Sequence, residues 1–161
     1  MSLITVILSL LALLTGTPSN GWTPAPTPPF DQAAGVTCDF PIHGRAIVDH
    51  VVTKVLTSYP DGSIKRDAYQ GALVIRVTNT LTGAYYDADA SGSAVVDHAP
   101  DGAQTWYVVG PVLAGFRTGK GNLPRGMYVL DGLYRLQISS AGYVTLTLAR
   151  GHTDNICDRI G

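Results

Sequence analysis

The side chains best suited to bind a charged group are three cations in a glycine-rich stretch. Arg117, Lys120 and Arg125 lie between Gly115 and Gly126, with no acidic residue among them. Cations and accessible backbone amides together hold phosphate or carboxylate groups, and long loops of compact domains often carry function. The stretch predicts a binding loop for an anionic partner such as a cell-envelope polymer. The alternative is a solvated loop whose charges serve solubility.

A second stretch has part of the spacing of a calcium-binding loop. Asp87, Asp89 and Ser91 place oxygen atoms at alternate positions, and Gly92 stands at the sixth position. The twelfth position is His98, where such a loop needs a bidentate glutamate. The three oxygen-bearing residues are therefore a weak calcium candidate, and a polar bend is the favoured interpretation. No other metal site and no cofactor is predicted.

Catalytic motifs are missing from the sequence. It has no Gly-x-Ser-x-Gly and no closely spaced histidine pair. His50 and His98 each follow an aspartate, but neighbours in a strand point to opposite faces, so these pairs make poor acid/base dyads. A non-catalytic module is the favoured interpretation, with a site assembled from distant residues as the alternative.

Two cysteines, Cys38 and Cys157, stand near the two ends of the expected domain. In an exported protein such a pair predicts a disulfide. A metal or catalytic thiol is the weaker alternative, because no Cys-x-x-Cys and no histidine pair accompanies either cysteine.

The composition constrains the elements that must position these residues. Among 161 residues there are 18 glycines and 10 prolines, and the formal net charge is -1. All acidic residues are aspartate, so glutamate, a good helix former, is absent. Short strands with tight turns suit this composition. The near-neutral charge excludes a nucleic-acid protein, whose surface would carry a large basic excess.

The amino-terminal part indicates export. Residues 1–17 hold a short apolar run and predict a signal peptide, although no lysine or arginine precedes the run. An uncleaved membrane anchor is the alternative. Residues 18–37 are rich in threonine and proline and predict an extended linker. Residues 38–161 then form one domain, in a secreted or cell-envelope protein.

Apolar and polar residues alternate along 73–78, 134–138 and 144–148, as in strands with one buried face. Turn clusters at 59–62, 79–83, 99–102, 131–132 and 139–142 separate such runs. Gly71, Gly92 and Gly110 interrupt strand-like runs and indicate bends or bulges. We expect an all-β antiparallel meander that closes into a small β-barrel, with the disulfide joining its first and last strands. A two-sheet β-sandwich is the alternative.

The order of these features resembles an uncharacterised family of short secreted actinobacterial β-proteins. The resemblance rests on Cys38-Asp39-Phe40, the two Pro-Asp-Gly turns at 60–62 and 100–102, Thr78-Asn79 followed by Thr82-Gly83, the Ser91-Gly92 bend and Cys157. It implies export and a β fold, and it carries no catalytic residues.

Two functions of different classes follow from the sequence. The first is an exported, non-catalytic module that binds a surface partner, a polymer or a small apolar ligand. The second is a small barrel enzyme of the isomerase or hydrolase type, which would need a cavity lined by a few converging polar groups.

Overall fold

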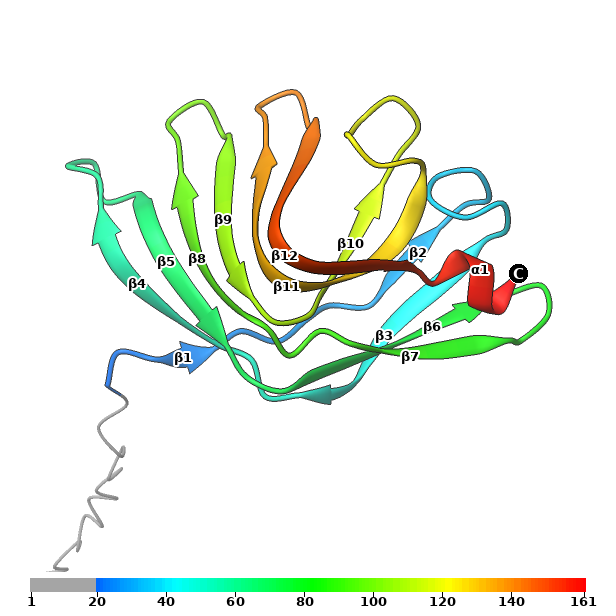
Figure 1. Ribbon diagram of the computed structural model, residues 1–161. Helices are drawn as coiled ribbons and strands as arrows, with labels where there is room; N and C mark the ends of the chain where they lie inside the picture. The colour runs from blue at the N-terminus through cyan, green and yellow to red at the C-terminus, as the bar shows by residue number, and fades with distance from the viewer. Residues whose placement is uncertain (1–19) are drawn as a thin grey trace, which may run out of the picture.

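The computed structural model describes residues 20–161 (Figure 1). The predicted signal peptide at 1–17 lies outside the described residues. No helix in the described part is long and apolar enough to cross a membrane.

The protein is all-β and antiparallel, as the alternating runs predict. Within residues 20–161, twelve strands are followed by one short helix, in the order β1 (Thr23–Pro24), β2 (Phe30–Gln32), β3 (Ile42–Asp49), β4 (Val52–Ser58), β5 (Ile64–Gln70), β6 (Leu73–Asn79), β7 (Tyr85–Asp89), β8 (Ser93–His98), β9 (Gln104–Val109), β10 (Val112–Phe116), β11 (Gly126–Ile138), β12 (Val144–Asn155) and α1 (Cys157–Ile160).

These strands form a meander of long, bent strands divided into two sheets. The larger sheet has the order β1-β4-β5-β8-β9-β11-β10, with β12 also paired to β11, and the smaller has the order β2-β3-β6-β7. In Figure 1, β4, β5, β8 and β9 form one arm, β3, β6 and β7 extend in the other direction, and β11 and β12 curve from one arm into the other.

The bends fall where the sequence predicts them. Gly71 separates β5 from β6, Gly92 precedes β8, and Gly110 separates β9 from β10. Backbone hydrogen bonds continue across the bends, from the Gly92 amide to the Pro111 carbonyl at 2.7 Å and from the Gly110 amide to the Gly132 carbonyl at 2.8 Å. The bends therefore form a line across neighbouring strands, along which the meander folds.

The turn expected at residues 131–132 is wrong. The Asp131-Gly132 pair lies within β11, where Gly132 opposes Gly151 of β12. Both glycines have positive φ, 138° and 131°. A Cβ on Gly132 would lie 2.1 Å from the Arg150 carbonyl oxygen, so only glycine fits this part of the bend.

The expected barrel is wrong, because no sheet closes among the described residues. Strand β1 pairs with β4, and β12 pairs with β11, so the first and last strands do not meet. The disulfide joins Cys38, in the segment after β2, to Cys157 at the start of α1, rather than one strand edge to another. The bent sheets face one another as in the sandwich-like alternative.

The folded part begins earlier than residue 38. Within the expected linker, Thr23–Pro24 pairs with β4 and Phe30–Gln32 pairs with β3. Strand edges accept such proline-rich segments because a proline lacks only its own amide donor.

Two clusters of buried residues make up the core. The first includes Ile42, Val77, Ile156, Ile160 and the disulfide, between the smaller sheet and α1. The second lies inside the bent larger sheet and includes Val96, Val108, Phe116, Leu130 and Leu136. Along the strands of the larger sheet, the side chains that alternate with those of the second cluster point outward. They form the site described next.

Candidate functional site

The predicted binding loop is held against β12. The Val144 amide donates to the Lys120 carbonyl at 2.9 Å, and the Asn122 side chain accepts from the Leu146 amide at 2.8 Å. Asn122 thus satisfies backbone groups at the start of this strand. The loop is a fixed part of the sheet edge.

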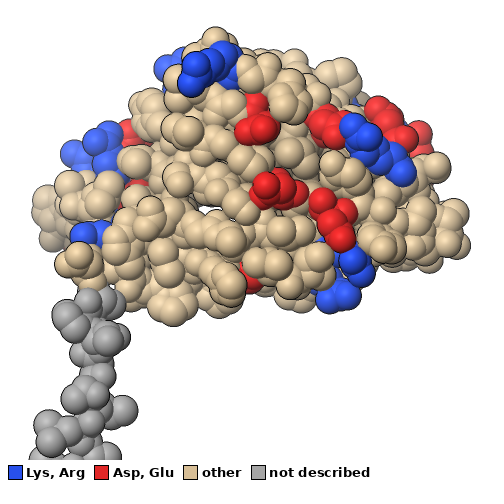
Figure 2. All heavy atoms as spheres, turned by 60° about the horizontal axis from the view of Figure 1, so that its bottom comes forward, with Lys and Arg blue, Asp and Glu red and all other residues tan. Residues whose placement is uncertain are grey.

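The structure brings two of the three predicted cations together. Arg117 and Lys120 line the same hollow of about 270 Å³, whereas Arg125 forms an ion pair with Asp39. Figure 2 shows the charged side chains of one face in small groups of both signs, with most of the surface uncharged.

The three calcium candidates are engaged with other groups. Asp87 lies within β7 and accepts two hydrogen bonds from Arg76, at 2.7 and 2.8 Å. Asp89 accepts from the Ser91 amide, and the Ser91 hydroxyl donates to the Leu73 carbonyl. No group of three or more histidine, cysteine or acidic side chains that could hold a metal ion occurs within residues 20–161.

The histidine that follows Asp97 is paired with a different aspartate. His98 Nε2 lies 2.9 Å from Oδ1 of Asp67, which is only 2% exposed. The other oxygen of Asp67 accepts from the Tyr69 hydroxyl at 2.9 Å. Alternation correctly separates Asp97 from His98, but no local sequence pattern points to Asp67, which β5 brings to the inner face.

The outer face of the larger sheet carries a row of hydrogen-bonding side chains, which we call the polar row. Its members are directly opposed in register across neighbouring strands, so their side chains share one face. From β4 to β12 they are Thr57, Arg66, Asp97, Thr105, Gln137 and Thr145. With strands about 4.8 Å apart, the row extends roughly 24 Å.

A second row runs beside it across four of these strands, β8, β9, β11 and β12. Val95 opposes Tyr107, which opposes Arg135, which opposes Thr147. The Tyr107 side chain is 48% exposed, while its neighbour Trp106 packs against the core. Alternation along β9 thus sends the Trp106 ring inward and leaves the Tyr107 ring as an aromatic face beside the polar row.

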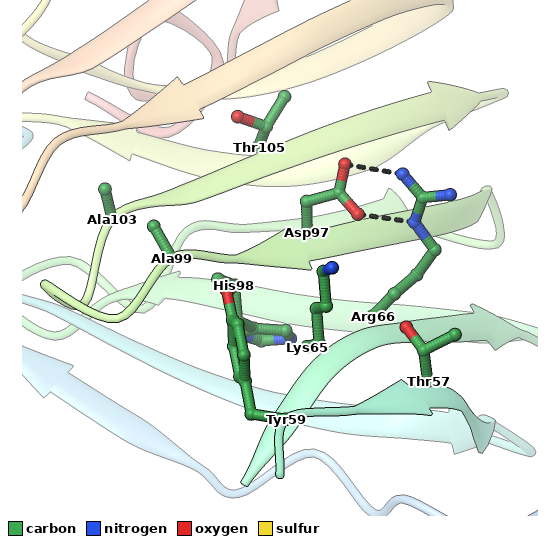
Figure 3. Close-up of a pocket in the computed structure, with 9 residues that line it drawn as sticks. All are labelled: Thr57, Tyr59, Lys65, Arg66, Asp97, His98, Ala99, Ala103 and Thr105. Atoms are coloured by element: carbon green, nitrogen blue, oxygen red, sulfur yellow. Dashed lines mark hydrogen bonds and ion pairs between the residues drawn. The ribbon is translucent and has the colours of Figure 1, made fainter.

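Three hollows lie along these two rows, and together we call them the outer groove. The first, about 460 Å³, is lined by Thr57, Arg66, Asp97 and Thr105 of the polar row (Figure 3). The second, about 260 Å³, shares Thr105 and continues along the polar row. The third, about 620 Å³, includes Tyr107 and the rest of the second row.

The charges in the outer groove are unequal. Arg66 donates to Asp97, as the dashed lines in Figure 3 show, and this contact holds the pKa of Asp97 below its ordinary value. Lys65 lies 5.7 Å from the centre of the Tyr59 ring. Neither Lys65 nor Arg135 takes part in an ion pair within the described residues. The groove therefore has two cations without an acidic partner.

No known protein family, curated protein or solved structure matches this chain. The geometry of its own residues is therefore the basis for assigning a function.

Proposed function

We propose that this protein is an exported binding module that holds an extended acidic polysaccharide of the cell envelope in its outer groove. The observation that carries the proposal is the polar row, in register over β4, β5, β8, β9, β11 and β12. A chain laid across the strands meets a new donor or acceptor at each strand, at a spacing similar to the length of one sugar unit.

The chemistry of the groove fits a sugar polymer with acidic groups. Hydroxyl, amide and guanidinium groups of the polar row match the many hydroxyls of a polysaccharide. The exposed Tyr107 ring offers an apolar face on which a sugar ring can stack. Lys65 and Arg135 supply the positive charge for a carboxylate or phosphate group on the polymer.

Export is supported by two independent observations. The sequence begins with a short apolar run typical of a signal peptide. The Cys38–Cys157 disulfide is of the kind that persists in oxidising compartments. A cell-envelope polysaccharide is available to a protein in that location.

The groove favours binding over cleavage. His98 lines the first hollow and is held by Asp67, which is the arrangement of a general base. Enzymes that cleave glycosidic bonds mostly use two carboxyl groups flanking the bond. Asp97 is the one carboxylate among the lining residues of the first hollow, and it is bonded to Arg66. We therefore expect no release of reducing ends when the protein is incubated with the polymer.

The proposal is tested by co-sedimentation with purified, insoluble cell-wall polysaccharide at low and moderate salt. A groove variant combines Tyr107→Ala, Arg135→Ser and Gln137→Ala, and a matched loop variant combines Arg117→Ser, Lys120→Ser and Arg125→Ser. We expect the groove variant to bind at least about tenfold more weakly, because an aromatic anchor and a cation are lost, and the loop variant to bind as the native protein does.

Other outcomes would contradict the proposal. If both variants bind like the native protein, the groove is not the site. If the loop variant alone loses binding, the site is the loop predicted from the sequence. Binding of a neutral glucan is measured in the same way. Because two cations of the groove are unpaired, we expect the protein to bind the acidic polymer more strongly than the neutral glucan.

A further inference from the structure

We infer that the interior of the fold holds a second binding site, for a small, uncharged and mostly apolar molecule. The site is a cavity of about 410 Å³ on the inner side of the bend, distinct from the outer groove and partly open to solvent, with Pro26, Pro28 and Gln70 exposed at its rim. Its volume lies within the range of pockets that bind small ligands.

The cavity lies between the two clusters of the core. Ile75 and Ala90 on its wall belong to the first cluster, and Ala94 belongs to the second. Trp106 and Leu113 pack against these clusters and also face the cavity. The space is thus a gap in the apolar core where the strands bend.

None of the residues that line the cavity carries a charge. Its two aromatic rings, Tyr69 and Trp106, lie almost parallel, with centres 6.0 Å apart and an angle of 10°. The Tyr69 hydroxyl donates to Asp67 and the Trp106 Nε1 donates to Gln104, each at 2.9 Å. Because these polar atoms are already bonded elsewhere, the rings offer apolar surface to a ligand.

A charged or strongly polar molecule would lose its hydration in this cavity without gaining partners, which is unfavourable. An apolar molecule would remove the apolar walls from contact with water, which is favourable. The chemistry of the walls therefore selects an uncharged, mostly apolar ligand.

The segment 25–28 forms one side of the cavity. Its residues Ala25, Pro26, Thr27 and Pro28 all line the space. The prolines have no amide to donate. The Ala25 amide bonds the Val51 carbonyl at 2.9 Å, and the Thr27 amide bonds the Asp49 carboxylate at 2.6 Å. These two hydrogen bonds hold the segment in place at the side of the cavity.

The test uses a neutral naphthalene dye, N-phenyl-1-naphthylamine, titrated into the folded protein. We expect saturable binding, with energy transfer from tryptophan to the dye. The chain has two tryptophans. In a Trp22→Phe variant Trp106 remains, so the transfer should persist because Trp106 is part of the wall.

Substitutions that fill the cavity provide the second readout. Ala94→Leu and Ala90→Leu, made separately, add volume at the wall and should weaken dye binding by about tenfold or more. Ala34→Leu, at an exposed position, is the matched control and should leave binding unchanged. The groove variant should also bind the dye normally.

Two results would overturn the inference. One is transfer that disappears in Trp22→Phe, which would place the dye near Trp22 instead. The other is equal dye affinity in the filled and control variants. If a filled variant does not fold, as judged by circular dichroism, the Trp22→Phe measurement alone decides.

Discussion

Arg66 on β5 donates two hydrogen bonds to Asp97 on β8, from Nε at 2.5 Å and from Nη2 at 2.8 Å. Both side chains belong to the polar row, and their opposite charges cancel there. The positive charge available to a ligand in the outer groove therefore comes from Lys65 and Arg135, which have no acidic partner within residues 20–161.

The Arg66–Asp97 pair should make a small, acid-sensitive contribution to stability. Arg66 lowers the pKa of Asp97 from 3.8, so the contribution is present above that value and is lost as the pH falls through the lower folded-state pKa. Asp97→Asn should remove this part of the acid dependence. Urea unfolding of both proteins between about pH 2 and pH 6 measures it. Identical pH profiles would show that the pair does not contribute, as some exposed pairs do not.

The buried carboxylate of Asp67 should contribute more to the free energy of unfolding than the Arg66–Asp97 pair does. Asp67→Ala would leave the Tyr69 hydroxyl and the His98 ring without their partner, which typically lowers the free energy of unfolding by about 1–3 kcal/mol. Asp67→Asn keeps an oxygen and a donor in place and should lose less. Chemical denaturation compares the two. Equal stability of Asp67→Ala and the native protein would mean that the network is not a stabilising one.

Alanine substitutions at Gly132 and at Gly142, which serves as the matched control, test the bend. Both have positive φ, but a Cβ on Gly132 meets the Arg150 carbonyl at 2.1 Å, while Gly142 has open space around it. Gly132→Ala should lower stability by about 3 kcal/mol or more, because backbone must move. Gly142→Ala should lower it by only about 1–2 kcal/mol. Similar effects in thermal unfolding would argue against the close approach of β11 and β12.

The disulfide should stabilise the fold without being required for its strands. Cys38 and Cys157 are 119 residues apart, and a loop of this length corresponds to roughly 4–5 kcal/mol at most in the chain-entropy model. Replacing both cysteines with serine should lower the melting temperature, while the far-ultraviolet circular dichroism of the folded state stays the same. Loss of the strand signal at low temperature would show that the crosslink is needed for folding itself.

Much of the fold was predictable from local signals. The alternation along 73–78 and 134–138 corresponds to β6 and to the end of β11. The turn at 99–102 closes a hairpin, with the Gly102 amide bonded to the Ala99 carbonyl at 3.0 Å. The choice between a barrel and bent, open sheets was not predictable in this way. This choice depends on how sharp several bends are and on how they line up across neighbouring strands. No single stretch of the sequence determines these two properties.

The polar row could have been found by extending strand register from the tight turns. The hairpin at 99–102 places Asp97 opposite Thr105, and the turn at 139–142 places Gln137 opposite Thr145. Joining these pairs needs the register of β9 against β11, and β10 and the loop after it separate these two strands in the sequence. The interior cavity gave no such signal, because its lining residues come from segments scattered between Ala25 and Leu113.

Amide NMR spectra of the protein, titrated with soluble oligosaccharides from an acidic cell-envelope polysaccharide, test the outer groove most directly. We expect shifts to concentrate on the outward-facing residues Thr105, Tyr107, Arg135, Gln137 and Thr145, and affinity to rise with oligosaccharide length until the groove is filled. Shifts confined to residues 115–126, or no shifts at any length, would contradict the proposed function.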